Sequence, residues 1–369
     1  MVKLSNKNCC ERKKTSIGGQ ALIEGIMMRG PKMSAMAVRN PEGEIVLEKW
    51  ETKSSTKAKF FKLPVVRGLF NFIDSMKSGY KCLMRSAEIS GLDALEEEEK
   101  RKKQEKKEQK AKKKAARKGI AEQDTEVTEV AEEIKSEEKA KKEDSGVLMG
   151  AVMVISSVLA VVISVTLFFW LPTLLYNWIS GVLPFLRPEN EALASLVKSV
   201  FEGVLKIIIL VGYMALVSLM KDIRRTFMYH GAEHKTIFCY ESGLELTVEN
   251  VKAQRRFHPR CGTSFLILML LVGIFIAFFI DPISILATGS VPPAWLRTLI
   301  KLILLPLTMG IGYELIKLAG RKNNLLTRII SAPGVWLQHL TVFEPDDDMI
   351  ECAIVAFKEV IPEDGSDNY

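Results

Sequence analysis

The feature that most constrains the fold is a stretch without any charged side chain, over residues 145–186. It contains the apolar segment 147–171, which is long enough to cross a bilayer as a helix, since about 20 residues span the hydrocarbon core. Three further segments of this kind follow, over residues 196–220, 264–280 and 296–319. We therefore expect a membrane protein, mainly α, with about four transmembrane helices.

The placement of charge argues against nucleic-acid binding. The formal net charge is +7, yet residues 96–118 hold twelve Lys or Arg against six Glu (+6), and residues 119–144 hold four Lys against ten Asp or Glu (−6), so these blocks cancel. The excess positive charge therefore lies beside the apolar segments, as in membrane proteins that follow the positive-inside rule. A basic stripe with interleaved aromatic residues is not visible, so we expect no nucleic-acid partner.

The basic residues also orient the predicted helices. The loop over residues 221–263 contains eight Lys or Arg, whereas the loop over 172–195 contains one and the loop over 281–295 contains none. Because basic loops stay on the cytoplasmic side, we expect the 221–263 loop and both termini in the cytoplasm. The polar N-terminal stretch does not resemble a signal peptide. The six Cys residues would then be reduced thiols rather than disulfides.

Residues 1–92 are predicted to be a small mixed α/β cytoplasmic region. Short strands are expected over 35–38 and 44–48, joined by an Asn-Pro-Glu-Gly turn, followed by an amphipathic helix over 64–89. Within this region, residues 16–31 hold four Gly around the polar candidates Glu24 and Arg29. This segment is either a loop that docks on the membrane domain or a glycine-kinked strand.

The rest of the chain divides at changes of composition. Residues 93–145 are rich in Glu, Lys and Ala and are predicted to be a charged, disordered linker. Residues 146–320 form the predicted transmembrane domain. Residues 321–369 form a cytoplasmic tail, in which Pro and acids over 345–348 precede periodic apolar residues and predict a helix start.

A metal site is suggested by His230, Glu233 and His234, which follow the second apolar segment. If this part is helical, the two His side chains lie one turn apart on one face and can share a metal. The pattern H-x-x-E-H is the inverted form of a zinc-protease motif, in which the Glu acts on the reactive water. In the simpler interpretation, these polar residues cap a membrane helix at the headgroup level.

Candidates for a third ligand are His258 and Cys261, which lie where the chain returns to the third apolar segment. The sequence does not choose between them, and Cys239 and Glu241 are weaker candidates. Glu314, in the fourth segment, is a further option because intramembrane acids are often functional. It can equally be a helix-packing acid that pairs with Lys317 or Arg321. Among divalent metals, zinc best matches His and Cys ligands.

Four motifs taken together resemble the YqhQ-like bacterial membrane proteins, a domain-of-unknown-function family sometimes described as predicted metal-dependent enzymes. They lie over residues 18–29, 229–236, 258–265 and 340–347. The resemblance implies a bacterial polytopic inner-membrane protein, but it supplies no reaction. The last motif has Val342 and Phe343 where a more polar pair is expected, which argues against a direct role for this tail in the site.

We therefore predict a multi-pass protein of the bacterial inner membrane with a divalent-metal site, best suited to zinc, at the cytoplasmic membrane face. His230 and His234 would bind the metal, His258 or Cys261 would complete the site, and Glu233 would be the general base of a hydrolytic reaction. The substrate would be membrane-associated, either a lipid-linked molecule or a peptide.

Two other functional classes remain open on the sequence. A non-enzymatic scaffold or assembly factor would recruit protein partners, and its His and Cys groups would form a closed structural metal site or bind no metal. A transporter would use inward polar residues, namely Glu202, Lys206 and Glu314, and with four helices per chain it would favour a homo-oligomer. Glu202 and Lys206 are one helical turn apart and can pair with each other.

Overall fold

The computed structural model describes residues 14–52, 63–91, 155–321 and 324–367. The chain divides into two compact units: Ala94–Val182, and a larger unit made of Met1–Asp93 and Leu183–Tyr369. The predicted linker over 93–145 lies outside the described residues. In the smaller unit, Ile155–Val182 is one apolar helical stretch, π-helical over η2 (Thr166–Trp170) and α-helical over α4 (Leu171–Val182).

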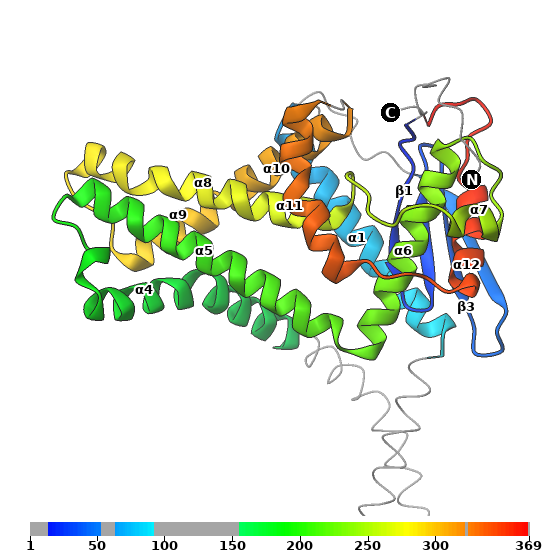
Figure 1. Ribbon diagram of the computed structural model, residues 1–369, viewed down its shortest axis with the longest axis horizontal. Helices are drawn as coiled ribbons and strands as arrows, with labels where there is room; N and C mark the ends of the chain where they lie inside the picture. The colour runs from blue at the N-terminus through cyan, green and yellow to red at the C-terminus, as the bar shows by residue number, and fades with distance from the viewer. Residues whose placement is uncertain (1–13, 53–62, 92–154, 322–323, 368–369) are drawn as a thin grey trace, which may run out of the picture. The chain divides into compact units, whose positions relative to one another are not determined.

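The larger unit begins with a four-stranded antiparallel sheet whose strands follow one another in sequence order (Figure 1). The strands are β1 (Gly18–Leu22), β2 (Gly25–Arg29), β3 (Met33–Arg39) and β4 (Ile45–Glu51). The predicted hairpin is confirmed as β3 and β4, and Gly43 in its turn has a φ of 89° that glycine adopts without strain. The Gly-rich segment is the strand alternative, β1 and β2, so the sheet has two strands more than expected.

Each face of the sheet packs on different helices, because side chains alternate along a strand. One face meets α6 (Lys221–Glu241), the short α7 (Val248–Lys252) and α12 (Asp347–Lys358), and it forms the main apolar core with fully buried residues such as Ile26, Tyr229 and Phe357. The other face, with Met27 and Met36, meets Cys82 of α1 (Val66–Ile89). The predicted helices over 64–89 and after Pro345 are thus confirmed as α1 and α12.

The remaining helices of this unit are long and apolar. They are α5 (Glu191–Ser218), preceded by the short η3 (Pro184–Leu186), then α8 (Gly262–Thr288), α9 (Ala294–Ile303) and α10 (Leu305–Arg321). Among the described residues, three helices are long and apolar enough to cross a membrane: Ile155–Val182, Leu193–Ser218 and Gly262–Thr288. The pair α9 and α10, bent by 46°, is a fourth candidate if it counts as one broken span.

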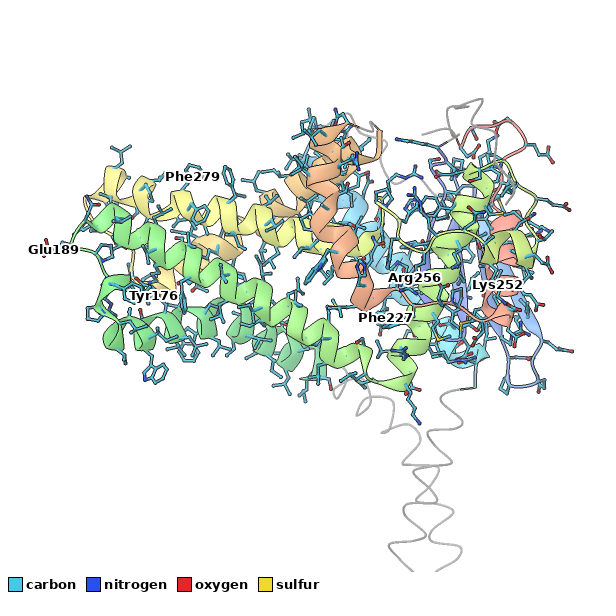
Figure 2. The ribbon with its side chains drawn as sticks, in the orientation of Figure 1. Tyr176, Glu189, Phe227, Lys252, Arg256 and Phe279 are labelled. Atoms are coloured by element: carbon cyan, nitrogen blue, oxygen red, sulfur yellow. The ribbon has the colours of Figure 1, made fainter. Side chains whose placement is uncertain are left out.

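Many large apolar side chains of these helices point outward. Phe279 on α8 projects away from the neighbouring helices (Figure 2), and it is 49% exposed. Leu216 on α5 and Leu286 on α8 are exposed as well. A surface of this kind is unusual for a water-soluble protein and fits contact with lipid.

The two charged residues singled out within α5 face inward, as expected, and Glu202 pairs with a third helix. Glu202 and Lys206 are both buried, and the Glu202 carboxylate accepts a hydrogen bond from Lys301 Nζ of α9 at 2.9 Å. A second buried pair joins Asp281 of α8 to Arg297 of α9. Because burying a charge is costly unless it is paired, these pairs fix how α9 packs on α5 and α8.

A helix that the sequence did not predict, α11 (Leu325–Thr341), occupies the first part of the C-terminal segment. It packs on α8 and α10, and a Cβ added at Gly334 would lie only 2.4 Å from Ser264 Oγ, so the two helices approach closely. Asn324 caps its first turn by accepting a hydrogen bond from the Thr327 N–H. This helix leads directly into the residues that surround the candidate site.

Candidate metal centre

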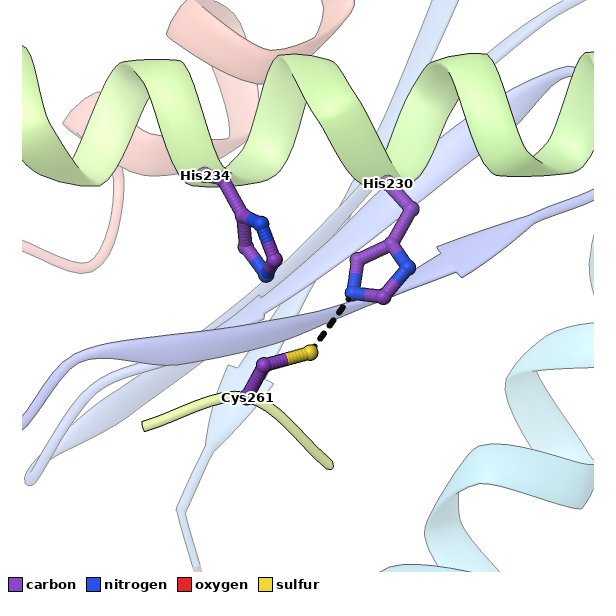
Figure 3. Close-up of side chains that lie close together, drawn as sticks. All are labelled: His230, His234 and Cys261. Atoms are coloured by element: carbon purple, nitrogen blue, oxygen red, sulfur yellow. Dashed lines mark hydrogen bonds between the residues drawn. The ribbon is translucent and has the colours of Figure 1, made fainter. Parts of the chain in front are cut away.

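The helix α6 presents His230 and His234 on one face, one turn apart (Figure 3). The two rings lie edge to face with their centroids 4.4 Å apart. This helix is separate from the apolar helix before it, since α5 ends at Ser218 and α6 begins at Lys221. The predicted helical spacing of the two His residues is therefore present, on a helix that packs against the sheet.

Main-chain carbonyl groups hold both imidazole rings in one orientation. His230 Nδ1 lies 3.1 Å from the carbonyl oxygen of Thr341, and His234 Nδ1 lies 2.5 Å from that of Arg256. A carbonyl oxygen only accepts, so each Nδ1 carries the proton and donates it. Each Nε2 then bears the lone pair of the ring, which at His230 faces Cys261 Sγ at 3.0 Å, and this is the form of histidine that binds metals.

Cys261 completes the cluster from the other side. Its Sγ lies 3.0 Å from His230 Nε2, and the ligand atoms of His230, His234 and Cys261 all lie within 4.8 Å of one another (Figure 3). Around a tetrahedral zinc, with bonds of about 2.0 Å to nitrogen and 2.3 Å to sulfur, ligand atoms are roughly 3.3–3.6 Å apart. Small side-chain movements would therefore bring all three atoms to zinc-binding distance.

The Nε2 atom of His234 is buried without a hydrogen-bond partner in the described part of the chain. His234 is 1% exposed, and its Nε2 atom has no hydrogen-bond partner among the described residues. A buried polar atom without a partner costs about 1–3 kcal/mol, and native proteins rarely retain one without a reason. The orientation of this atom toward Cys261 and His230 supplies such a reason if a metal ion occupies the space between them.

His258, the other predicted third ligand, lies beside the cluster with its nitrogens engaged elsewhere. Its ring centroid is 5.4 Å from that of His234, its Nδ1 accepts from the Arg260 N–H, and its Nε2 faces the Arg260 guanidinium at 3.3 Å. Burial, together with nearby His234 and Arg260, lowers the pKa of His258 well below its usual value. The geometry therefore groups Cys261, rather than His258, with the two α6 histidines.

Glu233, the predicted general base, borders the same space. A cavity of about 160 Å³ is lined by three segments, which contribute Thr15–Gly19, then Glu233, His234 and Ile237, then His258, Arg260, Cys261 and Gly262. The Glu233 carboxylate is buried and accepts a hydrogen bond from the Gly19 N–H of β1 at 3.0 Å. Burial raises the pKa of Glu233, against the opposing effects of His230 and the Gly19 N–H.

The other predicted site residues lie outside the cluster. Glu24, in the β1–β2 turn with a φ of 50°, accepts hydrogen bonds from the Arg225 guanidinium and from the Tyr229 hydroxyl. Arg29 ends β2. Glu314 accepts from Arg67 of α1 at 2.6 Å, so its ion pair links α10 to α1 and is neither of the pairs that the sequence suggested. The role of Glu24 in this geometry is to hold α6 against the sheet.

The weaker candidates also have other roles. Glu241 forms a buried ion pair with Arg260 and accepts from the Thr15 N–H at 2.9 Å, so it fixes the wall of the cavity. The Cys239 thiol donates to the carbonyl oxygen of Glu245 at 3.5 Å. Neither residue joins the ligand cluster.

Several residues that support the site were missed by sequence reasoning. Gln338 of α11 is fully buried, and its side-chain amide accepts from the His258 N–H and donates to the His258 carbonyl, which clamps this loop. The C-terminal motif has a direct role after all, because the Thr341 carbonyl orients His230. This contact uses the main chain, so the unexpected side chains at Val342 and Phe343 do not prevent it.

Comparison with known proteins agrees with the sequence resemblance. Residues 63–363 match the family described as "Protein of unknown function (DUF1385)". The chain is also 31% identical over 348 residues to the uncharacterized protein YqhQ of Bacillus subtilis (strain 168), covering 93% of this chain and 92% of the relative. No solved structure matches the chain.

Proposed function

Since the chain belongs to the DUF1385 family, described as proteins of unknown function, we propose its function from the site itself: a membrane-spanning, metal-dependent hydrolase. Its site would lie at the cytoplasmic face of a bacterial inner membrane. Three steps support this proposal, namely the way the chain would cross the membrane, the geometry of the His and Cys cluster, and the position of Glu233 beside it.

The main apolar core supports four crossings. It unites residues from three parts of the chain, including Ile26 of β2, Tyr229 of α6 and Phe357 of α12, so all three parts must lie on one side of the membrane. The chain then crosses an even number of times between them. The helix over Ile155–Val182 with α5 gives two crossings, and α8 with the bent pair α9 and α10 gives two more. The eight basic residues of the 221–263 loop favour the cytoplasm for this side.

The observation that carries the metal proposal is the buried Nε2 atom of His234. It has no hydrogen-bond partner among the described residues, although it lies in a cluster with His230 Nε2 and Cys261 Sγ. Two imidazoles held by main-chain carbonyls and one thiol form a donor set that fits zinc. Three protein ligands leave one coordination position open, as in catalytic rather than structural zinc sites.

Glu233 would serve as the general base. Its carboxylate lines the cavity next to His234 and Cys261 without belonging to the ligand cluster. A bound zinc ion would supply Lewis acidity toward a carbonyl or phosphoryl oxygen of the substrate. Glu233 would take a proton from the attacking water, and the burial that raises its pKa makes it a stronger base. The substrate would be a lipid-linked molecule or a peptide, since the site lies next to the apolar helices.

The test is the zinc content of the detergent-purified protein by elemental analysis. We expect about one zinc per chain, and loss of most of it in His230→Ala, His234→Ala and Cys261→Ser, because each variant removes one of three ligands. His339→Ala is the matched control, since His339 is an exposed histidine on α11 that does not belong to the cluster. A well-folded protein that binds no zinc even after zinc addition would contradict the proposal.

A second measurement tests whether Glu233 acts as a general base or as a metal ligand. Glu233→Gln keeps the size of the side chain and its acceptor for the Gly19 N–H, so we expect it to retain zinc. It cannot accept the proton, so hydrolysis of any substrate found by screening should fall by roughly 10²–10⁴-fold. Loss of zinc together with activity would instead make Glu233 a ligand or a structural residue.

A further inference from the structure

The helix α1 has one face that is fully used in packing. In its first turns, Arg67 donates to Glu314 and Asn71 donates to the Tyr313 hydroxyl, both on α10. Farther along, a Cβ added at Gly79 would lie 2.2 Å from Gln20 Oε1 of β1, and Cys82 is buried against the sheet. These residues recur at helical spacing and define the face by which α1 joins the sheet to the apolar helices.

A neighbouring flank of the same helix is apolar and exposed. Met76, Tyr80 and Met84 are spaced by one helical turn, and 54%, 57% and 42% of their surfaces are exposed. Leu69 and Ile73, which are half-buried, extend this flank toward the start of the helix. We call these five residues the apolar flank of α1. On a water-soluble surface such a row is unfavourable, because each apolar side chain remains in contact with water.

The next flank of α1 is charged. Lys77, Lys81 and Arg85 follow the apolar residues around the helix, with Asp74 and Glu88 among them, and Arg85 pairs with both Glu48 of the sheet and Glu88. A helix with an apolar flank bordered by Lys and Arg is the pattern of helices that lie in a membrane interface, where the apolar side enters the acyl chains and the basic side meets lipid phosphates. Tyrosine is also favoured at this depth.

The position of α1 fits this pattern. Phe72 packs against Phe265, with ring centroids 5.4 Å apart, and Phe265 lies in the first turn of α8. If α8 crosses the bilayer, its first turn lies at the membrane boundary, and α1 begins at that depth. Figure 1 shows α1 between the sheet and the apolar helices, inclined to α5 and α8.

From these observations we propose that α1 is an interfacial helix that inserts Met76, Tyr80 and Met84 into the cytoplasmic leaflet of the membrane. This inference rests on the proposed membrane location and adds a second mode of lipid contact beside the spanning helices. It places the sheet, and with it the cavity at Glu233, at a fixed height above the lipid, because α1 is bound to both α10 and the sheet. A substrate with a lipid anchor then reaches the cavity from the membrane surface.

A second copy of the chain is a poorer occupant for this flank. Three side chains that are each about half exposed offer far less than the roughly 800 Å² per partner that a stable protein interface buries. A bilayer has no such requirement, since it covers any apolar surface at its depth in proportion to area. Lys77 and Lys81 on the next flank also match anionic lipid headgroups.

The inference is tested by placing photoreactive benzoylphenylalanine at Met76 or Tyr80 in the full-length protein. The protein is reconstituted in vesicles of phosphatidylethanolamine and phosphatidylglycerol, irradiated, and analysed by mass spectrometry for lipid adducts. Glu245, exposed in the loop after α6 on the other side of the sheet from α1, is the control. Phe275, which is 61% exposed on α8, is the reference for a spanning helix.

We expect lipid adducts at Met76, Tyr80 and Phe275, and about fivefold fewer at Glu245. Adducts at Phe275 but none at Met76 and Tyr80 would overturn the inference and leave the membrane-spanning proposal intact. Absence of adducts at all four positions would overturn both. Crosslinks from Tyr80 to a second copy of the chain would overturn the inference in favour of a dimer interface.

Discussion

At the scale of single residues, the candidate site is shaped by what the main chain does to the two histidines. The carbonyls of Thr341 and Arg256 fix the protons of His230 and His234 on Nδ1, so both Nε2 atoms are available before any metal arrives. Ligands that are already oriented lose little conformational entropy on binding, which favours affinity. The arrangement therefore fits a site that is formed by folding rather than by the metal.

A pH-dependent stability is expected from Glu233. Because burial raises the pKa of Glu233 above its usual value of about 4.5, the folded protein holds a proton that the unfolded chain has lost. The resulting stability is present at low pH and is lost as pH rises through the raised pKa. Glutamine does not ionise, so the Glu233→Gln variant does not lose this stability as pH rises. The thermal unfolding midpoint of the variant should exceed that of the natural chain by roughly 2–4 °C at pH 8 and by less at pH 5.

This measurement is made with a chelator present, so that metal binding does not contribute. Glu245→Gln is the control, because Glu245 is exposed in the loop after α6 and should leave the pH profile unchanged. An identical pH profile for Glu233→Gln and the natural chain would contradict the assignment of a raised pKa to this carboxyl group.

The ligand cluster was partly predictable from sequence, for a physical reason. Side-chain chemistry and helical spacing identify His230, Glu233 and His234, since residues four apart share a face wherever the helix lies. The grouping of Cys261, rather than His258, with the two histidines was not predictable, because it depends on a loop that Gln338 clamps from a distant helix. The carbonyl contacts were invisible as well, since any residue type can provide a carbonyl.

At the scale of elements, the position of α6 depends on a close approach to the C-terminal segment. A Cβ added at Gly231 would lie 2.0 Å from the carbonyl oxygen of Phe343, so only glycine lets the helix pass at this distance. The Phe343 N–H also donates to the carbonyl oxygen of Phe227, which ties the same segment to α6. This crossing brings Thr341 to His230.

Gly231→Ala is therefore expected to separate α6 from the C-terminal segment. It should destabilise the protein by about 1–3 kcal/mol, as overpacking does, and it should lower zinc content by disturbing the orientation of His230. Gly212→Ala is a matched control within α5, where a Cβ would have open space, and there alanine should be neutral or slightly stabilising. The unfolding midpoint and zinc content are measured for both variants. Equal midpoints for the two variants would contradict the close approach.

The sequence predicted elements well where local signals were strong. Uncharged apolar segments marked the long helices, and the Asn-Pro-Glu-Gly turn marked the hairpin of β3 and β4. The helix α11 was not predicted, because Pro333 lies inside it and proline usually argues against a helix interior. The sequence also left β1 open, because the glycines there have low strand propensity and the strand is stabilised by packing under α6.

At the scale of the whole molecule, the sheet domain is assembled from three separated parts of the chain. The main core is shared among them, since the sheet contributes one face and α6 and α12 contribute the other. Residues 1–92 look like a small folded region in the sequence, but they share their main core with residues beyond 220. Under the proposed membrane topology, such an assembly requires that the intervening segments return to the same side of the membrane.

The proposed topology can be tested by labelling cysteines introduced at exposed positions with a membrane-impermeant maleimide in intact cells. Ser290→Cys, in the loop between α8 and α9, should be labelled from outside, whereas Ser242→Cys after α6 and Glu363→Cys after α12 should react only after permeabilisation. The natural chain gives the background of its own thiols. The reason for the expectation is that α6 and α12 share one core, so an even number of crossings must separate them.

Labelling of Ser242→Cys and Glu363→Cys from opposite sides would contradict the shared core, and labelling of both from outside would reverse the proposed orientation while retaining four crossings.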